Sequence, residues 1–256
     1  MIAALGMYDR AETAPALDRL WSLIRDGLRA EGIAAPEGLT RGGAAYASSW
    51  QSPDLLLGQT CGLPFRAGLH RHVALVGTPD HGVEGCPPGY YRSVLVARAD
   101  DPRDSAAAFG GARLAINDAG SQSGWAAPQA HFAALGARPA AVVVTGAHRA
   151  SAQAVLNGEA DLAAIDAVTW ALIAAHDGWS AGLKVVGQTE ATPGLPLITA
   201  RAELAPALFA ATAAAIDALA ESDRRSLRLR GLVRIPAEAY LALPLPPPAV
   251  PQEGAA

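Results

Sequence analysis

The sequence has 256 residues, of which 51% are hydrophobic and only 5% aromatic, and its formal net charge is −4. A chain of this length can bury a large core without disulfides, and its acidity disfavours nucleic acid as a partner. No apolar run reaches the roughly 20 residues that a membrane-spanning helix needs. These numbers predict a globular protein of one large domain or two lobes.

Strands and helices alternate in the first hundred residues. Residues 2–7 predict a short strand. Residues 14–31 predict a helix, because apolar side chains recur there at spacings of three and four, and Thr13 precedes it as a cap. The remaining apolar runs predict strands at 39–41, 55–57, 73–79 and 91–98.

A second series of elements begins after a break at residues 100–102. We expect strands at 113–117, 141–144, 162–166, 183–187 and 197–200, and helices at 124–135, 149–157, 167–176 and 203–221. The Pro-rich tail after Leu243 predicts disorder. Strands that alternate with helices in this way predict an α/β fold with mostly parallel sheets flanked by helices.

The breaks in this pattern divide the chain into two expected lobes. Lobe 1 is discontinuous and combines residues 1–97 with 195–256, and lobe 2 is residues 98–194. We expect hinges near 96–100 and 188–194, and a ligand cleft between the lobes.

Small polar residues follow two of the predicted strands. Residues 120–124 (Gly-Ser-Gln-Ser-Gly) follow one strand, and residues 145–151 (Thr-Gly-Ala-His-Arg-Ala-Ser) follow the next. Residues 54–62 form a third such turn. The free N–H groups and the dipole at a helix start favour anions, so these turns predict a site for a polar or anionic ligand.

Two enzymatic or metal-dependent alternatives fit the sequence poorly. A nucleophile elbow needs Ser at the centre of G-x-S-x-G, where this chain has Gln122. The spacing of the residues that could suggest zinc matches no compact pattern: Cys61, His70, His72, His81 and Cys86. No catalytic residue, metal or cofactor is therefore predicted.

Each candidate residue also has a purely structural interpretation. Ser121 could be an ordinary helix cap, and His148 a surface histidine at a helix start. Asp166 could cap the helix that begins near residue 167 or contact a ligand. Tyr8, at the end of the first strand, could belong to the core.

Six segments, in this order, resemble the PhnD-like branch of phosphate and phosphonate substrate-binding proteins of ABC transporters. They lie at residues 7–9, 54–62, 89–93, 117–124, 145–148 and 158–166, and the resemblance covers roughly residues 1–222. It implies the type II periplasmic-binding-protein fold and a non-enzymatic solute-binding protein. Such a protein closes on a small polar or anionic ligand, a phosphonate, phosphate or similar oxyanion. By position, the ligand contacts would be Tyr8, Gln59, Thr60, Tyr91, Ser121, Gln122, Ser123, His148 and Asp166.

The sequence departs from this family in two places. Gln122 stands where phosphonate binders usually have a small hydroxyl residue. The first eight residues predict a strand rather than the leader and lipobox of an exported protein. The resemblance implies a periplasmic location, whereas the sequence start predicts a cytoplasmic one.

Three roles therefore remain open. The first is a monomeric binding protein whose partner is an ABC permease or a sensor protein. The second is an enzyme of the same fold that acts on a small metabolite in cofactor biosynthesis, and the third is an intracellular ligand sensor. Both cysteines lie in predicted loops of the first lobe, so a disulfide between Cys61 and Cys86 is a candidate in an oxidising compartment.

Overall fold

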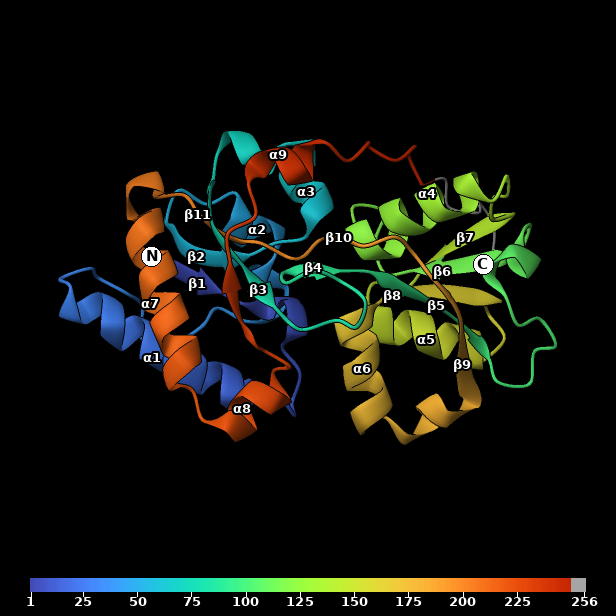
Figure 1. The fold of residues 1–256 in the computed structure, drawn as a ribbon, viewed down its shortest axis with the longest axis horizontal. Helices are drawn as coiled ribbons and strands as arrows, with labels where there is room; N and C mark the ends of the chain where they lie inside the picture. The colour runs from blue at the N-terminus through green and yellow to red at the C-terminus, as the bar shows by residue number, and fades with distance from the viewer. Residues whose placement is uncertain (250–256) are drawn as a thin grey trace. The chain divides into compact units, whose positions relative to one another are not determined.

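The computed structural model describes residues 1–249, and these form two compact units (Figure 1). Unit 1 comprises residues 1–90 and 193–243, and unit 2 comprises residues 91–192 together with the segment that begins at Pro244. The chain therefore passes between the units after Tyr90, after Thr192 and after Leu243. Two short strands at the first two passages, β4 (Tyr90–Tyr91) and β10 (Thr192–Pro193), pair with each other.

Unit 1 has a five-stranded mixed sheet of order β1-β2-β11-β3-β12. Strands β1, β2 and β3 run in the same direction, and β11 runs antiparallel to both of its neighbours. The strands are β1 (Ile2–Ala4), β2 (Leu55–Gln59), β3 (Ala74–Asp80), β11 (Leu197–Thr199) and β12 (Gly231–Val233). The helices are α1 (Ala14–Ala30), α2 (Ala47–Trp50), α3 (Gly62–Ala67), α7 (Ala205–Ala218), α8 (Glu221–Ser226) and α9 (Ala237–Leu241).

Unit 2 has a five-stranded mixed sheet of order β7-β6-β8-β5-β9. Its strands are β5 (Ser93–Arg98), β6 (Arg113–Ile116), β7 (Ala141–Val144), β8 (Leu162–Asp166) and β9 (Leu183–Gln188). Strands β6, β7 and β8 are parallel, whereas β5 is antiparallel to β8 and β9. The helices are α4 (Ala127–Ala134), α5 (His148–Leu156) and α6 (Ala167–His176).

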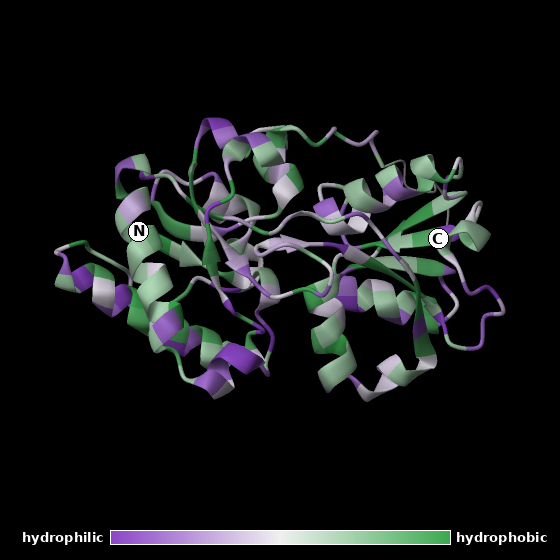
Figure 2. Cartoon of the chain, viewed as in Figure 1, coloured by the Kyte–Doolittle hydropathy of each residue, from purple (hydrophilic) through white to green (hydrophobic). Residues whose placement is uncertain are grey.

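Alternating side chains give the sheet of unit 2 two buried faces. Val94 and Val96 of β5 pack in the cluster on the side of α5 and α6, whereas Leu95 and Ala97 pack on the side of α4. This period of two is the geometry of a strand, and burial on both faces explains why the strands are apolar throughout. Figure 2 shows these strands mainly in the green of hydrophobic residues.

Helix α1 of unit 1 is amphipathic, as its spacing predicts. Leu17, Leu20, Trp21, Ile24 and Leu28 are all buried against the sheet and α7. Its polar residues appear as purple segments between green ones in Figure 2. No helix among residues 1–249 has the length and apolarity to cross a membrane.

Three expectations from the sequence need correction. Residues 39–41 are not a strand. Thr40 N–H donates to Ala3 O at 2.7 Å, but the segment has no strand geometry and then enters a 3-10 turn. The strand at 93–98 belongs to unit 2 rather than to the first lobe, because it pairs with β8 and β9. Residues 244–249, expected to be disordered in lobe 1, are placed in unit 2, and the rest of the predicted tail lies outside the described residues.

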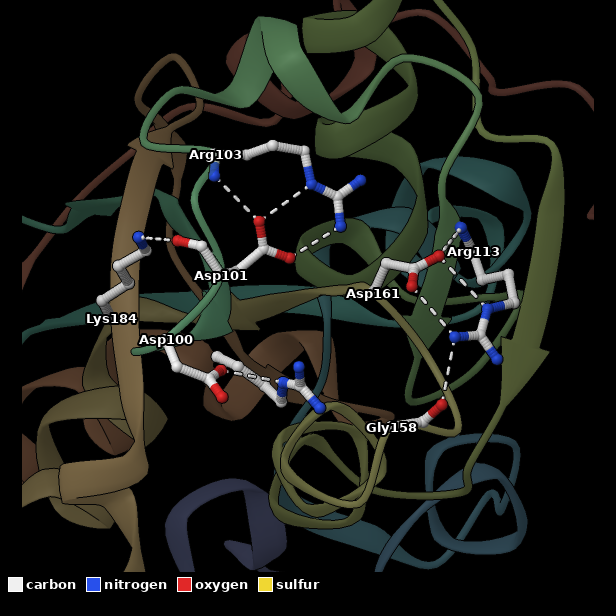
Figure 3. Close-up of polar contacts among 8 residues, drawn as sticks. Asp100, Asp101, Arg103, Arg113, Gly158, Asp161 and Lys184 are labelled. Carbon is white, nitrogen blue, oxygen red and sulfur yellow. Dashed lines mark hydrogen bonds and ion pairs between the residues drawn. The ribbon is translucent and has the colours of Figure 1, made fainter.

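A network of ion pairs joins the segments at one end of the unit 2 sheet (Figure 3). Arg113 donates to both carboxylate oxygens of Asp161 and to Gly158 O, and Arg103 donates to both oxygens of Asp101. The pKa of Asp101 falls to about 2, mainly because of the hydrogen bond from Arg103. This network lies at the end where β6 and β8 begin, away from the polar turns that follow them.

Candidate ligand-binding site

The polar turns of unit 2 follow the carboxyl ends of three parallel strands. Residues 121–123 follow β6, residues 145–148 follow β7, and Asp166 ends β8. Parallel strands that are neighbours place their carboxyl ends at one edge, which is where α/β sheets bind ligands. The turns predicted separately from sequence therefore lie together.

The first turn is held by the side chain of Ser121. Ser121 Oγ accepts from Gly124 N at 2.9 Å and thereby caps a π-helical turn at residues 122–126. Ser121, Gln122 and Ser123 are all at least 95% buried. A π-helical turn is rare and is often found at functional sites, because it redirects backbone and side chains locally.

His148 connects the second turn to the first. Its Nε2 lies 2.9 Å from Ser123 Oγ, and Ser123 Oγ lies 3.5 Å from Ser121 Oγ. Desolvation lowers the pKa of His148 to about 4, with the Ala164 carbonyl opposing the shift. The imidazole is therefore neutral at pH 7, so the Ser121–Ser123–His148 cluster can offer hydrogen bonds to a ligand without carrying a positive charge.

Ser93 and Asp166 lie opposite each other at the same edge. They are register partners in β5 and β8, and Ser93 Oγ donates to Ser123 O at 2.8 Å. Asp166 Oδ1 accepts from Val168 N at 2.7 Å and from Thr169 N at 3.0 Å. Of the two roles left open for Asp166, the structure thus contains the cap of α6, and its contact with a ligand stays a prediction.

The first turn approaches β6 closely at Gly124. A Cβ atom on Gly124 would lie 1.9 Å from Asn117 Oδ1, far below any real contact distance. Asn117 follows β6 and also accepts at its backbone oxygen from Gly146 N at 3.0 Å. Gly146 has a φ of 85°, which favours glycine. Asn117 therefore lies between the two turns and contacts both.

Helix α5 begins at the site with His148 itself. Its cap residue, Ala147, makes no side-chain cap hydrogen bond. Arg149 extends away from the cluster toward Asp177, where Nε donates at 3.0 Å and Nη2 at 2.8 Å. This ion pair fixes the start of α5 and so the position of the His148 ring.

The predicted residues of unit 1 lie at the carboxyl ends of its own parallel strands. Gln59 ends β2 and is buried, and Thr60 N–H donates to Pro196 O at 3.0 Å. Tyr8 follows β1 and His81 follows β3. Their rings make an edge-on contact, with 4.8 Å between the ring centroids. The Thr13 hydroxyl, predicted to cap α1, instead donates to Tyr8 O at 2.7 Å and so fixes this turn.

Two further predictions concern Tyr91 and the cysteines. Tyr91 is buried in the short strand β4, directly before β5. Cys61 is buried and Cys86 is partly exposed, and both are thiols in the structure, so it does not contain the disulfide suggested for them. The disulfide remains a prediction for oxidising conditions.

Four residues position these turns although the sequence predicted no such role for them. Ser93, Asn117 and Thr189 contribute through hydrogen bonds or close packing, and His81 through its ring contact with Tyr8. For example, no local pattern predicts the hydrogen bond that Ser93 N–H donates to Thr189 Oγ1, because the two residues are 96 positions apart in the sequence. Of these four residues, only Asn117 could have been suggested from the sequence, by its position at the end of a predicted strand.

Comparison with known families decides what kind of protein carries this site. The family described as ABC transporter, phosphonate, periplasmic substrate-binding protein matches residues 62–237. The chain belongs to this family. The match includes parts of both units: the connection between β2 and β3, residues 91–192 of unit 2, and most of the returning segment of unit 1. No curated protein matches the sequence significantly.

Solved structures agree on the fold of the family. PhnD1 from Prochlorococcus marinus, in complex with methylphosphonate, is 14% identical with a TM-score of 0.71, and the alignment covers 93% of this chain and 94% of that one. XAC2383 from Xanthomonas citri, bound to ATP, is 16% identical with a TM-score of 0.67, covering 94% and 96%. The periplasmic aliphatic sulphonate binding protein SsuA from Escherichia coli is 17% identical with a TM-score of 0.59, covering 100% and 82%. The fold is therefore that of type II periplasmic binding proteins, as the sequence predicted.

Proposed function

We propose that this chain binds a small tetrahedral oxyanion of the phosphonate or phosphate class and presents it to an ABC permease unchanged. The observation that carries the proposal is the Ser121–Ser123–His148 cluster at the carboxyl edge of the unit 2 sheet, where helix α5 begins. Hydroxyl groups and helix N–H groups are the donors that anions require. The ligands named for related structures, methylphosphonate, a sulphonate and ATP, all contain such an oxyanion.

We propose as ligand contacts the nine residues that the family resemblance implies. They are Ser121, Gln122, Ser123, His148, Asp166 and Tyr91 in unit 2, and Tyr8, Gln59 and Thr60 in unit 1. Because neutral donors are costly to bury unpaired, a ligand that lacks the matching acceptors leaves unsatisfied groups and binds weakly. Selectivity among oxyanions then follows from the shape and number of acceptors rather than from net charge.

The first experiment is a ligand panel on the full chain. Methylphosphonate, phosphate, sulfate, an alkyl sulphonate and a dicarboxylate are compared by isothermal titration calorimetry at pH 7, with thermal shift as a second readout. We expect at least one phosphorus oxyanion to bind more tightly than the dicarboxylate. A preference for the dicarboxylate, or binding of none of the oxyanions, would contradict the proposed ligand class.

The Ser123–His148 pair also has the geometry of a nucleophile and its base. A pKa near 4 makes His148 a weak base at neutral pH, because general bases work best with a pKa near the operating pH. We therefore propose binding without chemistry. Phosphorus NMR of methylphosphonate and of a simple phosphate ester should show both unchanged after prolonged incubation, and turnover that is lost in Ser123→Ala would favour the enzyme alternative.

Two statements about partners complete the proposal. The net charge of −4 disfavours nucleic acid, and the family implies a permease that receives the ligand. We also propose that the chain acts as a monomer. Light scattering at micromolar concentration should give a mass close to 26.1 kDa with and without ligand, and a mass of twice this value would reject the monomer.

A further inference from the structure

The segment after α9 makes a specific contact with unit 2. Trp125 Nε1 donates a hydrogen bond of 2.8 Å to Pro247 O. Ala249 packs against the apolar cluster of unit 2 that contains Trp125 and Phe132. With the segment in place, Trp125 is only 4% exposed, and Pro247 O supplies the partner that its buried indole N–H needs.

The composition of the segment suits this kind of contact. Pro244, Pro246, Pro247 and Pro248 each fix φ near −65° and remove an N–H group, which favours the extended polyproline conformation. In that conformation the carbonyl groups face outward and find no partner within the segment. Aromatic surfaces recognise such segments at low entropic cost, since the segment is already extended before it binds.

Trp125 links this contact to the Ser121–Ser123–His148 cluster. Its backbone N–H donates to Ser121 O at 3.2 Å, within the π-helical turn whose first residues are Gln122 and Ser123. The same residue thus holds Pro247 with its side chain and Ser121 with its backbone. A shift of the Trp125 backbone would move the Ser121 carbonyl and the turn that Ser121 caps.

We propose that the surface around Trp125 is a binding site for a polyproline-type segment, that residues 244–249 of the same chain occupy it, and that this docking holds the Ser121–Ser123 turn in its ligand-binding form. The proposal that residues 244–249 dock at this surface depends only on the observed contacts of the segment with Trp125 and its cluster. The effect on ligand affinity rests in addition on the proposed function, so the two parts need separate measurements.

Docking is tested without any ligand by nitrogen-15 NMR of the tryptophan side chains. The chain has five tryptophans, and the Trp125→Phe variant identifies which indole N–H signal belongs to Trp125. A variant that ends at Leu243 lacks the segment, and a variant that ends at Ala249 keeps it and serves as the matched control. We expect the Trp125 N–H signal to shift, and its hydrogen exchange to speed up by about tenfold or more, only in the shorter variant.

Addition of a synthetic peptide with residues 243–249 to the shorter variant should return the signal toward its full-length position. An unchanged Trp125 signal in the variant that ends at Leu243 would overturn the docking. If that variant fails to fold, the comparison uses the full chain alone. Exchange of the Trp125 N–H as fast as that of a solvent-exposed indole would then overturn the proposal.

The effect on the site is measured as the affinity for whichever oxyanion of the ligand panel binds. We expect Trp125→Phe and the variant ending at Leu243 to weaken binding about three- to tenfold, the scale of one lost hydrogen bond. Trp170→Phe, a partly buried tryptophan of α6, and the variant ending at Ala249 should bind like the full chain. Docking by NMR with unchanged affinity would reject the coupling while leaving the proposed function intact.

Discussion

At the scale of single residues, the Ser121–Ser123–His148 cluster consists of neutral side chains. His148 bonds to Ser123 rather than to a carboxylate, and its lowered pKa keeps it uncharged. Ser121 Oγ and Asp166 Oδ1 each accept a hydrogen bond from a backbone N–H group at the start of a helical turn. These bonds fix the backbone near the candidate site. The same residues are therefore structural caps and candidate ligand contacts, which is why sequence alone left both interpretations open.

The two depressed histidine pKa values predict how stability depends on pH. Desolvation lowers the pKa of His81 and of His148 to about 4, whereas the unfolded chain titrates near 6.5. Between these values the unfolded state binds more protons, so stability is lost as the pH falls from about 6.5 toward 4. From pH 7 to pH 5 we expect each histidine to account for about 1–2 kcal/mol of lost unfolding free energy.

Urea unfolding at pH 7 and pH 5 checks this in wild type and in His81→Asn and His148→Asn. Each substitution should reduce the loss of stability between the two pH values. His176→Asn, at an exposed position, is the control and should leave the loss unchanged. A loss that is equal in all four proteins would show that neither histidine is held neutral by the fold.

At the scale of elements, the contact between the π-helical turn and β6 depends on Gly124. Alanine there would place Cβ 1.9 Å from Asn117 Oδ1, so Gly124→Ala should lower the free energy of unfolding by about 1–3 kcal/mol, the usual cost of overpacking. Ligand affinity should fall as well, because the displaced turn carries Ser121 and Ser123. Chemical denaturation and calorimetry measure the two effects.

Gly178→Ala is the matched control for this substitution, since no atom of residues 1–249, apart from its chain neighbours, lies within 4 Å of the added Cβ. The double variant Gly124→Ala with Asn117→Ala removes the clashing carboxamide and should recover part of the stability. The effects of substitutions at residues in contact are not additive. If Gly124→Ala were as stable as Gly178→Ala, the close approach would not constrain the turn.

The ion-pair network of Figure 3 predicts a second effect at this scale. Arg113 binds Asp161 in a bidentate manner and also two loop carbonyls, those of Gly158 and Glu159. Because the side chain is partly exposed, Arg113→Ala should cost only about 1 kcal/mol of unfolding free energy. It should not change ligand affinity, since the network lies at the opposite end of β6. Arg71→Ala at an exposed position of unit 1 should have neither effect, and lost affinity in Arg113→Ala would contradict the assignment of the site.

Much of the architecture could be predicted from periodicity. The apolar strands buried on both faces and the amphipathic α1 are local patterns, and each appears where it was expected. Residues 39–41 and the strand at 93–98 could not be placed, because pairing partners far along the chain decide whether a segment is a strand and to which sheet it belongs. The docked residues 244–249 were missed for the same reason, since their partner, Trp125, lies 122 residues away from Pro247.

The site could be predicted only in part. Hydroxyl residues after the predicted strands correctly indicated the turns. The contact between Ser123 and His148 joins two of these turns. The π-helical turn, the lowered pKa of His148 and the contribution of Asn117 depend on packing that no short motif encodes.

At the scale of the whole molecule, the chain passes between its units at Tyr90, Thr192 and Leu243. The predicted hinges near 96–100 and 188–194 remain a proposal. Residues 90–93 are a further candidate hinge beside the first, because the chain passes from unit 1 to unit 2 after Tyr90. If ligand favours a closed form, the radius of gyration measured by X-ray scattering should fall at saturating ligand, by an amount set by the differential affinity for that form. A radius that stays constant with ligand bound would argue for a rigid pocket.

The central claim, that a small oxyanion binds at the Ser121–Ser123–His148 cluster, is tested most directly by one calorimetric comparison at pH 7. The tightest oxyanion of the panel is titrated into wild type, Ser123→Ala and Ser105→Ala, the last at an exposed serine of the same unit. Loss of the hydroxyl should weaken binding by about 1–3 kcal/mol in Ser123→Ala, because the His148 ring and the ligand both lose a partner. Ser105→Ala should bind like wild type. Equal affinities in all three proteins would place the ligand elsewhere and contradict the proposal.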